Sequence, residues 1–219
     1  MTTDLTTARP GPRSAPSPRS LRVLVPGVCA VLFAGVQLQA GVVTVAYRQL
    51  SPVPLDSLNF PYAGSMAVAM SLCWGLAQAL FVISLVAFAR SGATGRSRLG
   101  RLGSGLLILG GAVFVAAQVL SAILRDARMD EPSAGVAVML FAVGSLLTAL
   151  GFVCAGVAVL QARRWTSWRR FTPLAVGAAM VCLVPLQFTS LLALGVTLYA
   201  VTVLAFGVSL LAEQPDDPA

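Results

Sequence analysis

The sequence contains no histidine and no lysine, and its 15 basic residues are all arginine. Histidine is the commonest general base and metal ligand near neutral pH, so its absence removes the usual partner of a catalytic serine or threonine. No Cys/His cluster or CxxC pair is present either. We therefore expect no catalytic residues, no metal site and no bound cofactor, and we do not expect an enzyme.

Charge of either sign is scarce. Only 11% of the 219 residues are charged, 57% are hydrophobic, and the mean hydropathy is +0.85. Soluble domains carry about 25% charged residues, so this composition indicates a membrane protein. No charged residue falls inside a long apolar stretch, whereas proton- and ion-coupled carriers generally need one there. A coupled transporter is therefore disfavoured.

The four cysteines all fall inside apolar segments. Buried free cysteine behaves as a small hydrophobic side chain. We accordingly predict no disulfide and no redox role for Cys29, Cys73, Cys154 and Cys182.

Long apolar stretches, by contrast, dominate the chain. A helix that crosses a bilayer needs about 20 mainly apolar residues, and the last apolar block is too long for one crossing. Pro185, Gln187, Thr189 and Ser190 divide it into two. The first stretch is too long for the apolar core of a cleaved signal peptide. The sequence thus predicts an all-α, polytopic transmembrane helix bundle with six spans: residues 23–47, 66–89, 103–124, 135–160, 173–188 and 191–212.

The linkers alternate between arginine-rich and arginine-poor. The amino-terminal tail and the linkers at 90–102 and 161–172 hold four arginines each, while the intervening linkers hold fewer, accompanied by acids, or none. Because arginine-rich linkers remain cytoplasmic, both termini are predicted to be cytoplasmic, in the inner (plasma) membrane. This distribution also explains the pI of about 10.3 without nucleic acid as a partner. Residues 1–20 should form a disordered tail, residues 21–212 the membrane domain, and residues 213–219 a short acidic tail.

Small residues form a stripe on the second span. Ala67, Ser71, Gly75 and Ala79 follow one another at four-residue steps, and small residues allow membrane helices to pack closely. The stripe is either a face for a second copy or another membrane protein, or ordinary packing inside the bundle.

Four glutamines lie within the first three spans. Gln37 and Gln118 should lie at nearly the same height, because a helix rises 1.5 Å per residue, and Gln78 should lie nearer the bilayer centre. Gln39 is the fourth. An unpaired amide in hydrocarbon costs several kcal/mol, so these side chains should face protein or trapped water. They either join helices or line a small cavity for a neutral solute.

The linker at 162–171 combines tryptophans and arginines. Tryptophan at the headgroup level and arginine near anionic lipid are the usual anchors of a membrane interface, although a specific partner could dock there instead. The outer acids Asp126, Asp130 and Glu131 are interspersed with arginines and are expected to be solvated rather than to bind a cation. The predicted anchors are Arg163, Arg164, Trp165, Trp168, Arg169 and Arg170.

Three segments give the chain a resemblance to a group of uncharacterised six-helix membrane proteins from actinobacteria. They are the outer linker with Val-Pro-Leu-Asp at 53–56 and Asn-Phe-Pro-Tyr at 59–62, the basic linker at 89–96, and the fourth span at 156–160 with the Trp/Arg linker after it. The resemblance covers nearly the whole chain after residue 20. It implies a six-helix membrane fold and carries over no catalytic role.

Two functions remain open. The absent catalytic groups, the small-residue stripe and the short loops favour a non-enzymatic accessory, scaffold or partner-binding subunit that works through helix or lipid contact. The alternative is a facilitator or permease for a small neutral or lipid-like solute, with the glutamines as its lining. A polar cavity at the height of Gln37 and Gln118 would distinguish them.

Overall fold

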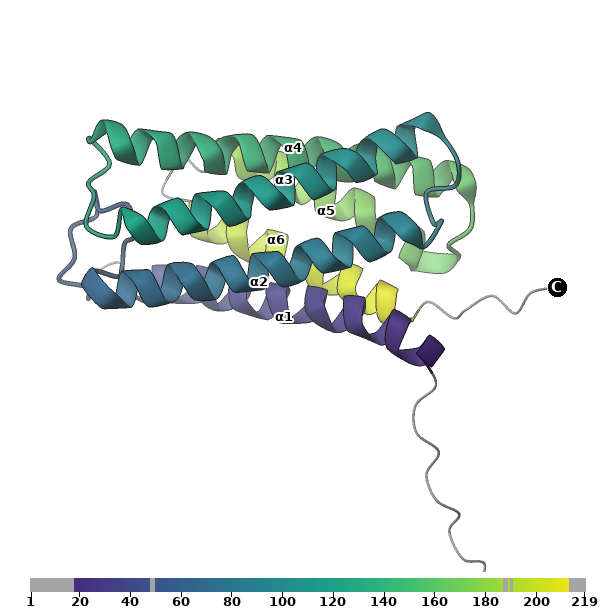
Figure 1. Cartoon of the computed structure of the whole chain (residues 1–219), viewed down its shortest axis with the longest axis horizontal. Coiled ribbons are helices and arrows are strands. Elements are labelled where there is room, and N and C mark those ends of the chain that lie inside the picture. The colour runs from purple at the N-terminus through teal and green to yellow at the C-terminus, as the bar shows by residue number, and fades with distance from the viewer. Residues whose placement is uncertain (1–17, 48–49, 187–188, 190, 213–219) are drawn as a thin grey trace, which may run out of the picture.

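The computed structural model describes residues 18–47, 50–186, 189 and 191–212, and within this part the chain is all-α, with six helices and no strand (Figure 1). All six are long and apolar enough to cross a membrane, with a short 3₁₀ helix, Ser167–Phe171, leading into α5. The chain is thus built as a multi-pass membrane protein. Most of the two predicted tails, residues 1–17 and 213–219, lies outside the described residues. The helices are α1 (Pro18–Tyr47), α2 (Gly64–Arg90), α3 (Arg98–Ile123), α4 (Pro132–Ala162), α5 (Thr172–Leu186) and α6 (Leu192–Leu211).

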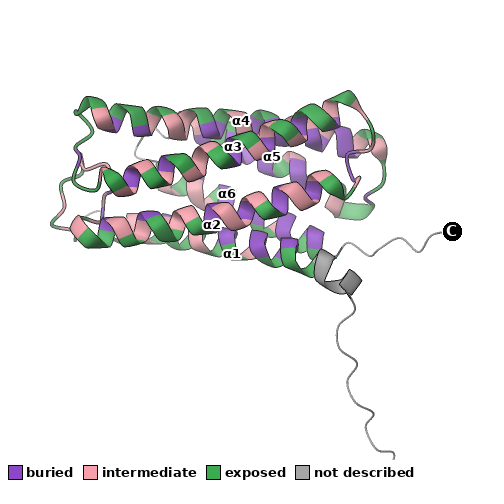
Figure 2. Ribbon diagram, in the orientation of Figure 1, coloured by how far each residue is buried: buried purple, intermediate pink, exposed green. Residues whose placement is uncertain are grey.

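The helices form a closed ring. Each packs against its neighbours in the sequence, and α6 returns to pack against α1 (Figure 1). Exposed positions occur along every helix of the ring (Figure 2), and many of them are large apolar residues, as expected where lipid is the solvent. The interior of the ring is therefore the only place where the bundle can shield polar groups from lipid.

The two ends of the ring differ in charge. The start of α1, the end of α6 and the loops at 91–97 and 163–171 lie at one end, and the loops at 50–63 and 124–131 lie at the other (Figure 1). We call the first the arginine-rich end and the second the mixed-charge end. The prediction that both termini lie on the same side agrees with this arrangement. Besides Arg19 and Arg22 in the first turns of α1, the arginines of the arginine-rich end are Arg90, Arg96, Arg98, Arg101, Arg163, Arg164, Arg169 and Arg170.

Helices α3 and α4 approach each other most closely, through glycines. A Cβ atom added to Gly103 would lie 2.6 Å from the backbone nitrogen of Ala155 and 2.9 Å from the carbonyl oxygen of Gly151. Real Cβ atoms do not approach backbone so closely, so the two helices could not keep this separation with a side chain at Gly103. Gly110 is in similar contact with Thr148, one heptad further along α3.

Aromatic side chains fill the ring toward the arginine-rich end. Phe33 stacks on Phe81 with a centroid separation of 4.4 Å, and Phe206 lies edge-on to both Phe88 (5.2 Å) and Phe152 (5.5 Å). These phenylalanines are fully buried. Such aromatic pairs contribute about 0.5–1.5 kcal/mol each beyond their burial. They close this half of the ring. We call the following set the aromatic plug: Phe33, Phe81, Phe88, Phe152, Trp165 and Phe206.

Candidate functional site

Between the aromatic plug and the mixed-charge end, the helices line a partly open cavity of two adjoining chambers. The deep chamber, of about 300 Å³, reaches Phe33 and Tyr199 near the middle of the bundle. The shallow chamber, of about 260 Å³, lies closer to the mixed-charge end, beside Thr44 and Trp74. The side chains shared by both chambers are Gln37, Leu58, Gln118, Phe141, Leu192 and Val196.

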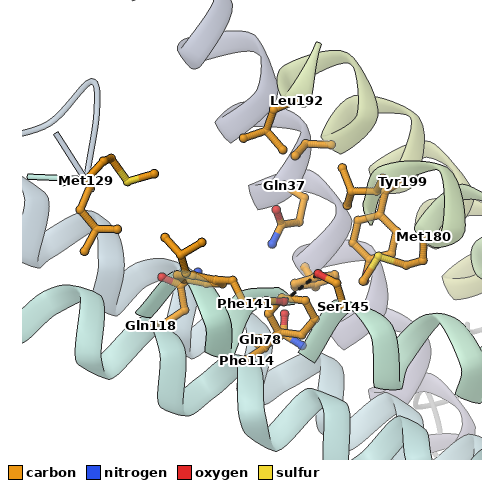
Figure 3. Close-up of a pocket in the computed structure, with 15 residues that line it drawn as sticks. Gln37, Gln78, Phe114, Gln118, Met129, Phe141, Ser145, Met180, Leu192 and Tyr199 are labelled. Carbon is orange, nitrogen blue, oxygen red and sulfur yellow. Dashed lines mark hydrogen bonds between the residues drawn. The ribbon is translucent and has the colours of Figure 1, made fainter. Parts of the chain in front are cut away.

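Three of the four intramembrane glutamines meet at this cavity. Gln37 of α1, Gln78 of α2 and Gln118 of α3 all line the deep chamber, with Gln37 and Gln118 at its junction with the shallow one (Figure 3). Gln39 is exposed on the outside of the ring and lines neither chamber. Gln39 stands apart because residues two positions apart on a helix point in nearly opposite directions.

The amides that line the cavity are not bonded to one another. In the described part of the chain, the side chains of Gln37, Gln78 and Gln118 form no hydrogen bond with another protein group, and the hydroxyl of Tyr199 has none either. Each amide offers two donors and one acceptor oxygen, and the hydroxyl offers one donor and an acceptor. The deep chamber therefore presents unused hydrogen-bonding capacity from α1, α2, α3 and α6.

The chamber walls carry no charge. Apart from these polar groups, the deep chamber is lined by apolar and aromatic side chains and by Ser145, whose hydroxyl donates to the carbonyl oxygen of Phe141 (2.8 Å; Figure 3). Within the described residues, no arginine, aspartate or glutamate lines either chamber. A charge moved here from water would be costly to desolvate, so the chamber favours an uncharged occupant.

Two loops cap the cavity at the mixed-charge end. The backbone N–H of Leu58 donates to the carbonyl of Ala127 (3.0 Å), and that of Met129 donates to the carbonyl of Asp56 (2.8 Å). Arg128 also forms an ion pair with Asp56. The side chains of Leu58 and Met129 line the deep chamber. The paired loops at 50–63 and 124–131 thus form one cap over the cavity.

Asn59 fastens this cap to the helices. Its amide nitrogen donates to the carbonyl of Ser121 (3.2 Å) and lies 3.4 Å from the carbonyls of Leu124 and Arg125, at the end of α3. Its amide oxygen accepts hydrogen bonds from the hydroxyls of Ser71 (3.2 Å) and Ser121 (2.7 Å). Asn59 is buried, and it satisfies carbonyls that a helix end would otherwise leave unpaired. Sequence reasoning missed this role, because no spacing in the chain connects residue 59 with α3.

The predicted small-residue stripe of α2 packs within the chain. Ala67 and Ser71 are buried, and a Cβ added to Gly75 would lie 3.3 Å from the Cβ of Gln118 on α3. Ala79 is half-buried. The positions of α2 that face the ring interior or its cap follow alternating steps of three and four residues instead: Ala67, Ser71, Trp74, Gln78, Phe81, Leu85 and Phe88.

The Trp/Arg linker separates into two kinds of residue. Trp165, expected at the lipid headgroups, is 4% exposed and packs on Phe88, with the Arg169 guanidinium 5.3 Å from its ring centroid. Arg163 ends α4 with a left-handed backbone (φ 52°), and Trp165, two residues later, fills the arginine-rich end of the ring. Trp168 is exposed, as are Arg163, Arg164 and Arg170. These four can reach the membrane interface, whereas Trp165 belongs to the core.

The outer acids lie on the cap and are engaged by arginine or by backbone. Asp126 pairs with Arg125 (3.1 Å) and Asp130 with Arg128 (3.5 Å), while Glu131 accepts from the backbone N–H of Arg128 (3.0 Å). Among the residues that the structure describes, no group of acids, cysteines and histidines could hold a metal ion.

Together, the six membrane-length helices and the partly open cavity define a multi-pass integral membrane protein with an uncharged cavity among its helices. No protein family, no curated protein and no solved structure matches the chain. Function must therefore be argued from the cavity itself.

Proposed function

We propose that this integral membrane protein is a facilitator for a small, uncharged, lipid-like molecule, which it holds inside the helix ring. The observation that carries the proposal is the set of amides around the deep chamber. Amides that served only to join helices should be bonded to one another or to backbone, because an unpaired amide in hydrocarbon costs several kcal/mol. Among the described residues, those of Gln37, Gln78 and Gln118 form no hydrogen bond with protein, and they line the deep chamber. A bound molecule would complete their hydrogen bonds.

The character of the walls supports the same class of ligand. Binding sites for small molecules are mostly apolar, with a few placed polar groups, and measure about 300–1,000 Å³. The two chambers, of about 300 and 260 Å³, adjoin and share six lining residues. The uncharged lining argues against ions and in favour of a neutral molecule.

The competing proposal is an accessory subunit that binds a second copy or another membrane protein. It drew its residue-level support from the stripe Ala67, Ser71, Gly75 and Ala79. That stripe is engaged with Asn59 and α3 of the same chain, and so offers little free surface. A change such as Gly75→Ile would now be expected to disturb the contact with Gln118 inside the ring, whether or not a partner exists.

The proposal is tested by binding of 1-aminoanthracene, an uncharged fluorophore whose emission rises in apolar sites, to the purified protein in detergent. Wild-type protein should bind it saturably. The double variant Gln37→Leu/Gln118→Leu should bind at least about tenfold more weakly, since each lost hydrogen bond is worth about 1 kcal/mol. Flux of the molecule across proteoliposomes should fall in the same variant.

Gln39→Leu is the matched control, because it makes the same change two residues from Gln37, on the outside of the ring. It should leave the affinity unchanged. Thermal unfolding of the double variant should stay close to that of wild type, because the replaced amides have no protein partner to lose. Equal affinity in all three proteins, or a collapse of stability in the double variant, would contradict the proposal and make the amides structural.

A further inference from the structure

We infer that the molecule bound in this cavity is an uncharged amphiphile whose head group both donates and accepts hydrogen bonds, and that this head lies in the deep chamber with the apolar tail toward the mixed-charge end. The inference rests on the proposed function and gives its ligand a chemical class and an orientation.

The unused hydrogen-bonding groups concentrate in the deep chamber. The amides of Gln37, Gln78 and Gln118 and the hydroxyl of Tyr199 all border it. Every one of them can donate as well as accept. A head group that does both, such as a carboxamide or an alcohol, can satisfy more of them than an ester or ether, which only accepts.

Apart from Gln37 and Gln118, which border both chambers, most polar groups of the shallow chamber already have partners. The Thr44 hydroxyl donates to the carbonyl of Ala40 (2.8 Å), and the Ser121 hydroxyl donates to Asn59. The indole N–H of Trp74 has no partner, but its nitrogen is buried behind the chamber wall rather than exposed to it. The free polar groups that belong to one chamber alone, Gln78 and Tyr199, are thus in the deep chamber, and the part of the shallow chamber beyond Gln37 and Gln118 suits a hydrocarbon tail.

The aromatic plug fixes the direction of the tail. Phe33 lines the deep chamber and stacks on Phe81 (4.4 Å), so the plug blocks extension toward the arginine-rich end. The shallow chamber continues the space toward the cap, where Leu58 borders both chambers. Gln78 lies midway along α2, which runs from Gly64 to Arg90. The head would thus lie near the middle of the bundle with its tail toward the cap. A membrane lipid has the opposite orientation, with its head at the membrane surface and its tail toward the middle.

The test is competition for bound 1-aminoanthracene by three molecules of similar size and different heads: octanamide, methyl heptanoate and ionised octanoate. For wild-type protein, octanamide should displace the fluorophore at a concentration about tenfold or more below those of the other two, because only it is neutral and offers both donors and an acceptor. Equal potency of octanamide and methyl heptanoate, or stronger displacement by octanoate, would overturn the inference.

Two variants locate the head. Tyr199→Phe removes a single hydroxyl from the deep chamber and Gln78→Leu removes an amide, and each should lower the preference for octanamide over methyl heptanoate several-fold. Thr44→Val, which alters a hydroxyl of the shallow chamber, should leave the preference intact. Loss of the preference in Thr44→Val alone would place the head in the shallow chamber and overturn the orientation. Failure of the proposed function is distinct from these outcomes, because wild-type protein would then not bind 1-aminoanthracene at all.

Discussion

At the scale of single residues, Asn59 joins more parts of the molecule than any other side chain near the cavity. It contacts two hydroxyls and the carbonyl end of α3 from within a loop. A buried polar group that loses its partner costs about 1–3 kcal/mol. The position of the cap over the cavity therefore depends on this one amide.

Replacing Asn59 with Ala should lower the stability of the protein by about 2–4 kcal/mol, because at least two hydrogen bonds are lost and buried carbonyls are left unpaired. The measurement is thermal unfolding in detergent. Ser133→Ala, at a side chain whose hydroxyl makes only an exposed contact with Glu131, is the control and should change little. An unfolding midpoint unaffected by Asn59→Ala would show that the cap is held by other contacts.

The ion pair of the cap should matter much less than Asn59. Arg128 and Asp56 are about half exposed, and exposed pairs contribute about 0–1 kcal/mol. Asp56→Asn should therefore reduce stability by less than about 1 kcal/mol, and the difference from wild type should vanish at high salt. A loss comparable to that of Asn59→Ala, measured in the same unfolding assay, would contradict this ranking.

Residue-level prediction from the sequence was most specific where helix geometry alone decides the outcome. Gln37 and Gln118 were predicted at one height from the rise per residue, and in the structure both line the two chambers. It failed where the partner lies far away in the sequence. Nothing near Trp165 indicates that its ring packs on Phe88, since tryptophan beside arginine is equally typical of a membrane interface.

At the scale of elements, α2 shows that a four-residue repeat and a heptad repeat predict different buried faces for the same helix. Steps of four residues drift around a helix, so the stripe from Ala67 to Ala79 moves from the interior toward α3. Alternating steps of three and four, as in coiled coils, stay on one face. Ala67, Trp74, Phe81 and Phe88 keep to this second pattern. Reading the heptad spacing would have indicated the interior face directly.

The α3–α4 pair offers a sharp test of close packing. Gly103→Ala should destabilise the protein by about 1–3 kcal/mol, because the new methyl group would lie 2.6 Å from the backbone of Ala155 and the helices must separate. Gly105→Ala is the matched control on the same helix, where nothing lies within 4 Å. It should be neutral or slightly stabilising, since alanine favours the helix. Similar unfolding midpoints for the two variants would refute the close approach.

At the scale of the whole molecule, composition and linker charge predicted six membrane-length helices and both termini on one side, and in the structure the start of α1 and the end of α6 lie at the same end. The order of helices around the ring could not be predicted. An apolar helix surface does not specify its partner in lipid, where hydrophobic burial no longer drives association. Close glycine contacts do specify which helices pair. Some of them, such as Gly207 against Ala30 between α6 and α1, join parts of the chain that are far apart in the sequence.

We expect the arginine-rich end to face the cytoplasm. In a variant with the four native cysteines replaced by alanine, a cysteine at Asp130, in the cap, should react with a membrane-impermeant maleimide added to intact cells. A cysteine at Ser167, at the arginine-rich end, should react only after the cells are opened. Labelling of Ser167→Cys but not Asp130→Cys in intact cells would reverse the orientation.

The order of the ring also bears on how the protein is made. Because neighbours in space are neighbours along the chain, every helix after the first can dock on its predecessor as soon as both have left the ribosome, and α6 must in addition reach α1. Only α6 must find a partner synthesised much earlier, and until it reaches α1 the glutamine-lined interior lies open to lipid on one side. Biogenesis should therefore end with a single closing step, and the site for a ligand does not exist before that step is complete.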